Sequence, residues 1–436
     1  MDKYFKLLND LYPLHRTLVS DDTDKAYEMI LTVVKKMGLS GDNILLHEFP
    51  SGSELSTWIT PKKYNLKNYY LSEIKGKREN KLITKKEIPL SIAEYSHAVD
   101  RILTWDEIRS HLFHSDKRPQ DIPFVVKYLY KDNFGFCLPK IKFEKINPSS
   151  KFRAVIESEF TNDRLKCLEI VLPGKKEESV LSIANICHPY QVNDSITGVI
   201  NSLLLIEKFM KKKHNFTLRF GFWPETIGAQ AYFTKYHRRK SMFKYAIFTE
   251  MLGTSGKHAL QFSRQNNTLL DRAAEYVLKQ MNLPYYTGRY LSVLRNDERI
   301  ANGPNLDIPT VSLSRWPYAE YHTSADTPAI VNMRNIKTSS EATAMILDII
   351  DSDRVLYPSF FGQPFLTRFD LFYDPLESPD LEKLNKMQED IYSYSDGKTS
   401  LFDIAERLNY KWNNLIEEAR KLKQAGLFRY RRDKQL

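Results

Sequence analysis

The chain has 436 residues, of which 27% are charged and 42% are hydrophobic, and its formal net charge is +10. This length exceeds one ordinary domain and predicts about two or three. The hydrophobic content is enough for sizeable cores, but no apolar run reaches the ~18 residues that a transmembrane helix needs. We therefore expect a protein with no membrane span.

The positive charge is spread over several short clusters along the chain. Nucleic-acid binding favours a single basic stripe with interleaved aromatic residues, so we do not expect a nucleic-acid partner. Solvated faces of a basic protein, or attraction of acidic substrates and anionic partners, explain the clusters instead. They lie at residues 75–86, 211–213, 238–240 and 429–432.

The cysteines and the first residues bear on the cellular compartment. Cys137, Cys167 and Cys187 are few, odd in number and without the spacing of a metal-binding motif. Residues 1–10 are charged throughout and contain no signal-peptide core. Both features predict a reduced, cytoplasmic protein.

The first 142 residues predict two helices followed by a β-rich unit. Residues 1–12 form an amphipathic helix that Pro13 ends, and a second helix spans residues 23–37 with Asp21 and Asp22 as its cap. From about residue 43 to residue 142, short β-branched and aromatic runs alternate with Gly, Pro, Asn and Lys. Because helical and α/β stretches flank this unit, we interpret it as an inserted domain.

From residue 152 onward, strands alternate with helices. Such alternation predicts a mixed, mostly parallel sheet covered on both faces, which is an α/β fold. The predicted strands span residues 152–160 and 165–172 as a hairpin pair, then 180–187, 217–223 and 244–249. The predicted helices span residues 195–210, 228–236, 269–281 and 341–356.

A Pro- and aromatic-rich connection, residues 356–379, leads to a helical tail. Three helices are predicted there, followed by an apolar strand at Leu427 and Phe428, which matches a winged helix-turn-helix. Such units bind DNA or dock proteins, and behind an enzyme-like domain we favour docking. The predicted helices span residues 380–392, 400–408 and 412–424.

Imidazole and carboxylate side chains follow the predicted strands of the α/β region. His188 and Asp194 follow one strand, Glu225 and Glu250 follow the next two, and His322 lies in a later loop. Carboxyl ends of parallel strands meet at one sheet edge, where such side chains can hold a catalytic metal with an open position for water. Each residue alone also has a structural explanation, such as a helix N-cap for Asp194 or a loop hydrogen bond for His322.

The order of these segments resembles the di-zinc aminopeptidase superfamily that includes bacterial leucyl aminopeptidase and glutaminyl cyclase. More closely, it resembles a bacterial branch called aminopeptidase-like proteins, in which a β-rich domain is inserted near the N-terminus and a winged helix follows. The matching segments are Ile186-Cys187-His188-Pro189 with Asn193-Asp194, Pro224-Glu225-Thr226-Ile227-Gly228, Asn296-Asp297-Glu298-Arg299, and Tyr321-His322-Thr323-Ser324-Ala325-Asp326.

The resemblance implies roles for individual residues. His188 and His322 match zinc ligands, and Asp194 matches the carboxylate that bridges two metals in the aminopeptidases. The chain departs from the pattern at two places. Pro224 stands where the general-base glutamate is usual, and Glu250 stands where a shorter aspartate ligand is usual.

Loss of the usual base leaves three possibilities open. Glu225 leaves the metal and acts as the base, with His188, Asp194 and His322 holding one zinc ion. Alternatively Glu225 stays a ligand and Glu298 or Glu250 takes the proton, or hydrolysis is lost and the metal only binds. A base must come within about 2.6–3.2 Å of its proton or reach it through one water.

Four further residues have a functional and a structural explanation. Asp326 either orients the His322 imidazole or caps a helix. Arg299 and Arg315 either receive a substrate carboxylate or pair within the protein, and Tyr321 either stabilises an oxyanion or packs in the core.

Together these observations and the resemblance predict a zinc-dependent aminopeptidase-like hydrolase that acts on an amide bond of a peptide or small modified substrate. We expect one zinc ion rather than two, and a homo-oligomer is possible through the insert. The alternative is a non-catalytic metal-binding scaffold or regulator whose winged helix docks a protein or DNA. The predicted domains are residues 1–40 with 143–360 (α/β), 41–142 (insert) and 370–436 (winged helix).

Overall fold

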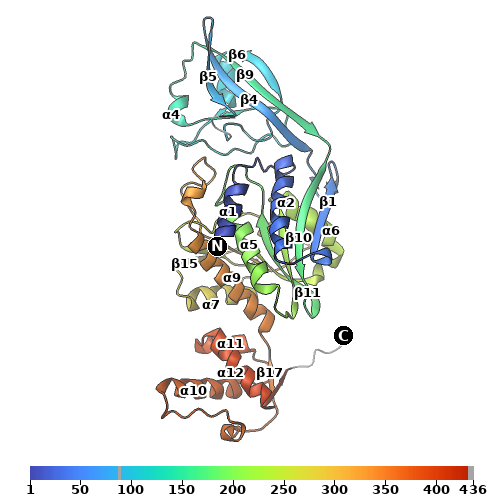
Figure 1. Cartoon of the computed structure of the whole chain (residues 1–436), viewed down its shortest axis with the longest axis vertical. Coiled ribbons are helices and arrows are strands. Elements are labelled where there is room, and N and C mark those ends of the chain that lie inside the picture. The colour runs from blue at the N-terminus through green and yellow to red at the C-terminus, as the bar shows by residue number, and fades with distance from the viewer. Residues whose placement is uncertain (87–89, 431–436) are drawn as a thin grey trace. The chain divides into compact units, whose positions relative to one another are not determined.

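The computed structural model describes residues 1–86 and 90–430, and its main feature is an eight-stranded mixed sheet (Figure 1). The strand order is β1-β10-β12-β11-β13-β16-β14-β15. The strands are β1 (Ile44–Pro50), β10 (Arg164–Leu172), β12 (Phe216–Trp223), β11 (Lys176–Asn185), β13 (Phe243–Thr249), β16 (Thr310–Ser314), β14 (His258–Gln261) and β15 (Tyr285–Gly288).

The centre of this sheet is parallel. β12, β11, β13 and β16 run in the same direction. The pairs β1–β10, β10–β12 and β14–β16 are antiparallel, and β14–β15 is parallel. The loops after the four parallel strands therefore emerge at one edge, where open α/β sheets place their sites. The predicted strands at 180–187, 217–223 and 244–249 are β11, β12 and β13, and the α/β fold is confirmed.

Helices cover both faces of the central strands. Leu181 and Ile183 of β11 are buried in a cluster with α6 (Ile227–Tyr236), whereas the Ser182 hydroxyl between them lies 3.5 Å from that of Ser202 in α5 (Ile196–Phe209). This alternation follows from the two-residue period of a strand. It sandwiches β11, and with it the loop that follows, between two layers of helix.

A single glycine lets α5 approach the sheet closely. A Cβ on Gly198, in the first turn of α5, would lie 2.2 Å from the carbonyl oxygen of Thr249, the last residue of β13. Any side chain would push the helix away from the strand end. The N-terminus of α5, which follows Asp194, is thereby held against the functional edge.

The predicted hairpin between residues 152–160 and 165–172 is wrong. β9 (Lys151–Thr161) pairs instead with β4 (Lys63–Lys75) and β6 (Val99–Leu103), in a separate sheet completed by β5 (Arg78–Thr84). β10 joins the main sheet between β1 and β12. The two-stranded sheets and short helices of this region are β2 (Glu54–Leu55) with β3 (Trp58–Ile59), β7 (Leu112–Phe113) with β8 (Phe136–Cys137), α3 (Trp105–Ile108) and α4 (Lys140–Phe143).

The two N-terminal helices form close to their predicted positions. They are α1 (Asp2–Leu11) and α2 (Asp21–Lys36), and the cap of α2 is Ser20, whose hydroxyl accepts the Thr23 amide, not Asp21 or Asp22. None of the helices in the described part of the chain combines the length and apolar character that spanning a bilayer requires.

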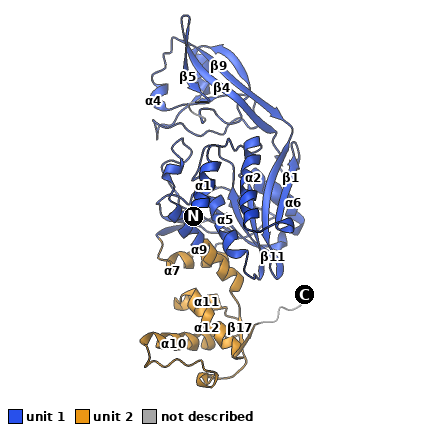
Figure 2. Ribbon diagram, viewed as in Figure 1, with its two compact units in different colours: residues 1–268, 284–341 blue, residues 269–283, 342–436 orange. Residues whose placement is uncertain are grey.

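The chain divides into two compact units (Figure 2). Unit 1 contains residues 1–268 and 284–341, and unit 2 contains residues 269–283 and 342–436. The helices not yet described are α7 (Leu269–Gln280), α8 (Glu298–Ala301), α9 (Met333–Ser352), α10 (Pro379–Tyr394), α11 (Leu401–Leu408) and α12 (Trp412–Gln424).

Unit 2 contains the predicted helical tail. α10, α11 and α12 match the three predicted helices, and β18 (Phe428–Tyr430) pairs antiparallel with β17 (Leu356–Pro358). A winged helix needs this kind of three-helix arrangement, but that assignment and the domain boundaries stay predictions.

Candidate metal centre

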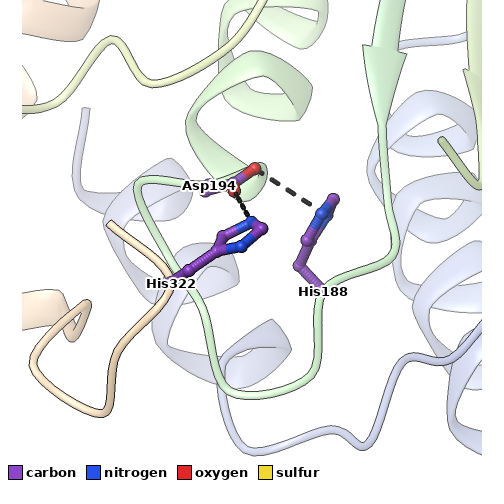
Figure 3. A group of neighbouring side chains, drawn as sticks. All are labelled: His188, Asp194 and His322. Carbon is purple, nitrogen blue, oxygen red and sulfur yellow. Dashed lines mark ion pairs between the residues drawn. The ribbon is translucent and has the colours of Figure 1, made fainter. Parts of the chain in front are cut away.

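Three side chains from distant parts of unit 1 meet at the carboxyl edge of the sheet (Figure 3). His188 lies in the loop after β11, Asp194 at the start of α5, and His322 in the loop after β16. One ligand atom from each lies within 4.8 Å of the others. His322 Nε2 is 3.1 Å from one Asp194 oxygen, and His188 Nδ1 is 3.7 Å from the other.

The donor atoms of this cluster fit a cation. Asp194 Oδ1 and His322 Nε2 are buried and make no hydrogen bond within residues 1–86 and 90–430. Buried polar atoms are normally hydrogen-bonded, so two such atoms in one cluster leave a place for a bound cation. Two imidazoles and one carboxylate are the set that a catalytic zinc ion takes, with a fourth position left open.

The charges of the cluster stabilise one another. Burial by itself would raise the pKa of Asp194, but His188, His322 and Arg16 hold it below its usual value. Burial opposes protonation of His188, yet Asp194, Cys187 and Glu225 raise its pKa well above the ordinary value. The site therefore concentrates negative charge around the two imidazoles, which favours a bound cation.

Glu225 lies against the cluster. Its Oε2 is 3.0 Å from His188 Nε2, and its side chain is 29% exposed. The residue sits in the turn between β12 and α6, where its amide donates to the Cys187 thiol at 3.1 Å. Glu225 thus contacts a candidate ligand while part of its side chain stays accessible to solvent.

Asp297 stabilises this turn by hydrogen bonds, a role that the sequence did not reveal. Its buried carboxylate accepts hydrogen bonds from the Asn185 amide group at 2.8 Å, from Trp223 Nε1 at 2.8 Å and from the Thr226 backbone at 2.6 Å. Thr226 adopts a left-handed φ of 61°, which is strained for a β-branched residue. One carboxylate therefore ties two strand ends to the turn that carries Glu225.

Glu298 and Glu250 face other partners. Glu298 is fully buried, accepts the Asn296 amide at 3.0 Å and the Gln261 side chain at 3.1 Å, and burial raises its pKa to about 7. Both oxygens of Glu250 accept Asn296 Nδ2 at 3.1 Å, and burial with the nearby Asp194 and Glu225 raises its pKa well above the usual value. Neither belongs to the three-residue group.

The other candidate residues make structural contacts. Asp326 accepts backbone amides of the loop that carries Asp194, instead of orienting His322 or capping a helix. Arg299 donates to the Thr226 hydroxyl, and Arg315 donates to the Gly256 carbonyl oxygen. Tyr321 stacks on the His322 ring with centroids 3.9 Å apart and stays partly exposed.

The β-rich region contributes a wall to the centre, which the sequence also did not reveal. The Phe124 ring packs edge-on against His188 and His322, at centroid distances of 5.7 and 5.1 Å. Its amide donates to the His322 carbonyl oxygen at 2.8 Å, and Pro123 forms a β-bridge with Thr323. An aromatic residue in a loop carries no signal of such a contact across the chain.

Comparison with solved structures identifies the fold. A crystal structure from Clostridium acetobutylicum, provisionally described as a peptidase, has a TM-score of 0.87 and 24% identity, and covers 98% of this chain and 96% of that chain. BSAP, a zinc aminopeptidase from Bacillus subtilis, has a TM-score of 0.59 and 11% identity, over 79% of this chain and 93% of its own. A peptidase M28 precursor from Shewanella amazonensis has a TM-score of 0.56 and 11% identity, over 84% and 95%.

The chain therefore has the fold of these peptidase and aminopeptidase structures. A Clostridium acetobutylicum protein, provisionally described as a polysaccharide biosynthesis protein with an aminopeptidase-like domain, is 27% identical over 406 residues, or 92% of this chain and 90% of the relative. The family model described as a domain of unknown function, DUF4910, matches residues 5–353, and the chain belongs to this family.

Proposed function

We propose that the protein is a zinc-dependent hydrolase that cleaves an amide bond by an aminopeptidase-type reaction. The observation that carries the proposal is the group of His188, Asp194 and His322 within 4.8 Å, with Glu225 beside it. The similarity to aminopeptidase-like proteins and to the BSAP fold supports it.

In this proposal His188, Asp194 and His322 hold one zinc ion. A bound zinc ion supplies a Lewis acid that polarises the scissile carbonyl and makes water more acidic. Arg16 donates to four backbone carbonyl oxygens of the loop that carries His188, so this ligand needs little reorganisation when substrate arrives. The open side of the centre is the side of Glu225 and of the partly exposed Tyr321.

Glu225 acts as the general base and then as the general acid. Its carboxylate takes a proton from the attacking water and returns it to the leaving amine. Pro224 has no group that moves a proton, and the oxygens of Glu298 are occupied by the Asn296 amide and Gln261. Glu225 is therefore the carboxylate best placed for this role.

The substrate we propose is a peptide or a small modified amide. Phe124 covers one side of both imidazoles, and the substrate approaches from the side of Glu225. The description of the Clostridium acetobutylicum relative, which names polysaccharide biosynthesis, favours a sugar-linked amide as one of the candidates to assay.

Metal analysis and hydrolysis assays test the proposal together. We expect the purified protein to carry about one zinc ion per chain and to cleave at least one member of an aminoacyl reporter panel, with the activity lost to a chelator and restored by zinc. His322→Gln should weaken zinc binding more than about 100-fold, beyond the 10–100-fold effect of losing an outer hydrogen-bond partner. The exposed His237→Gln is the matched control and should retain zinc.

Two results would contradict the proposal. If the unmodified protein does not bind zinc, the proposed metal centre is contradicted. The second result is a protein that binds zinc, loses it in His322→Gln, and hydrolyses neither a reporter nor a sugar-linked amide. This result would support the metal-binding scaffold instead. Pro224, which stands where the general-base glutamate is usual, is the feature that favours this second candidate.

A further inference from the structure

Arg16, in the connection between α1 and α2, directs both terminal nitrogens of its guanidinium group to one loop, whereas its Nε has no hydrogen-bond partner among residues 1–86 and 90–430. The side chain is 1% exposed. It donates to the carbonyl oxygens of Ile186 at 2.7 Å, Cys187 at 3.1 Å, His188 at 2.9 Å and Gln191 at 2.8 Å. These are the residues that lead into and out of His188.

The Asp326 carboxylate accepts hydrogen bonds from the backbone amides of the other half of the same loop. Its Oδ1 accepts the amides of Val192 at 3.2 Å and Asn193 at 2.7 Å, and its Oδ2 accepts the Asp194 amide at 3.1 Å. The Tyr318 hydroxyl donates to Oδ2 at 2.7 Å, which fixes the carboxylate itself. The side chain of Asp326 is fully buried.

The loop needs such partners because it is buried and irregular. His188 and Tyr190 both adopt left-handed φ values, 78° and 54°, which non-glycine residues rarely take. Buried backbone groups outside helices and strands must still find hydrogen-bond partners. A cation for the carbonyl oxygens and a carboxylate for the amides provide charge-assisted bonds, the stronger kind.

We propose that Arg16 and Asp326 are positioning residues that together fix residues 186–194 in the conformation that presents His188 and Asp194 to one metal ion. Arg16 holds the carbonyl side of the loop and Asp326 the amide side, so each controls one of the two ligands from its own end. The inference rests on the proposed metal centre, and it assigns neither residue a contact with metal or substrate.

Zinc binding of four variants tests this proposal, with zinc alone as the probe. Arg16→Met removes the guanidinium at similar volume, Arg16→Lys keeps the charge but offers too few donors for four carbonyl oxygens, and Asp326→Asn loses an acceptor. Arg219→Met is the matched control, since Arg219 is largely buried and pairs with Glu169 on another part of the sheet. The dissociation constant is measured by chelator competition, and thermal unfolding is followed with and without zinc.

A positioning role and a purely structural role give different results. We expect Arg16→Met and Asp326→Asn to weaken zinc binding about 10–100-fold, and Arg16→Lys to lie between these variants and the unmodified protein. The rise in melting temperature caused by zinc should shrink accordingly, because it depends on the ratio of zinc concentration to dissociation constant. Arg219→Met should lower the melting temperature while its zinc affinity stays within about twofold.

The outcomes separate this inference from the proposed function. Zinc affinity unchanged in both Arg16→Lys and Asp326→Asn overturns the positioning role even if the unmodified protein is an active hydrolase. Weakened zinc binding in a protein that hydrolyses nothing supports the positioning role and contradicts the hydrolase. If Arg16→Met does not fold, the Lys and Asn variants decide, and a chain that binds no zinc at all overturns both proposals.

Discussion

At the scale of single residues, Glu225 and Glu298 differ in what surrounds their carboxylates. Glu225 is partly exposed and contacts His188, whereas Glu298 is buried and accepts the Asn296 amide and Gln261. We expect Glu225→Gln to lower kcat about 10²–10⁴-fold, the usual contribution of general acid–base catalysis, while zinc content is retained. Steady-state kinetics and metal analysis of the purified variant check this.

Glu298→Gln is the counterpart of that experiment. Because its oxygens accept backbone and side-chain donors, the substitution should lower the melting temperature but leave kcat within about tenfold of the unmodified protein. The reverse order, with Glu298→Gln the slower enzyme, would assign the proton transfer to Glu298. Loss of zinc in Glu225→Gln would instead assign Glu225 to the metal.

Residue patterns predict some of this centre and miss the rest. His188, Asp194 and His322 stand out because imidazoles and acids follow predicted strands, and the structure brings them together; their role as ligands stays a prediction. Arg16 and Asp297 give no such signal, because most of their partners are backbone groups or lie far away in the chain. Every residue has the same backbone carbonyl and amide groups, so the sequence does not indicate which side chain will bind them.

At the scale of elements, His258 joins β14 to α9 through a bond of 2.9 Å between its Nε2 and the Ser339 hydroxyl. Burial, with a smaller effect of Arg315, lowers the pKa of His258 to about 4. The unfolded chain takes up this proton near pH 6.5, whereas the folded protein does so only near pH 4. Stability is therefore full above about pH 6.5 and is lost as the pH falls towards 4.

Between pH 6.5 and pH 5 only the unfolded chain binds this proton, and each of these about 1.5 pH units lowers the free energy of unfolding by about 1.36 kcal/mol. We therefore expect this histidine to lower the free energy of unfolding by about 2 kcal/mol between pH 7.5 and pH 5. His258→Gln should lose less stability than the unmodified protein over this range. Urea unfolding at the two pH values measures the difference, and the exposed His237→Gln should behave like the unmodified protein. Equal losses in all three proteins would contradict the assignment.

Elements with local signals are predicted best. α12 spans the predicted residues 412–424. The predicted start of α9 at residue 341 is eight residues late, because the first turns, residues 333–340, are mostly polar. The Asn332 side chain, which accepts the Arg334 amide, was the available start signal. The pairing of β9 with β4 joins distant segments, so adjacency in the chain misled the hairpin prediction.

At the scale of the whole molecule, the chain is organised as two units with separate cores. In unit 2, Arg272 of α7 pairs with Asp403 and Glu406 of α11, and the Tyr276 ring packs edge-on against Phe402. α7 lies between β14 and β15 in the sequence, more than a hundred residues before α11. The C-terminal helices thus share a core with a helix that was predicted to belong to the α/β domain.

This organisation predicts separable unfolding. Phe402 is fully buried and also packs against Trp412, so Phe402→Ala should destabilise unit 2 by about 3–5 kcal/mol. Under the proposed function, zinc binds the folded centre in unit 1 and is expected to stabilise that unit by mass action. Calorimetry of Phe402→Ala should then show an early transition that zinc does not shift, followed by a later one that zinc raises.

Phe233→Ala, in the unit 1 core, is the matched control and should lower the melting temperature of the zinc-sensitive transition instead. A single transition that moves as a whole with zinc in Phe402→Ala would show that the two units unfold together.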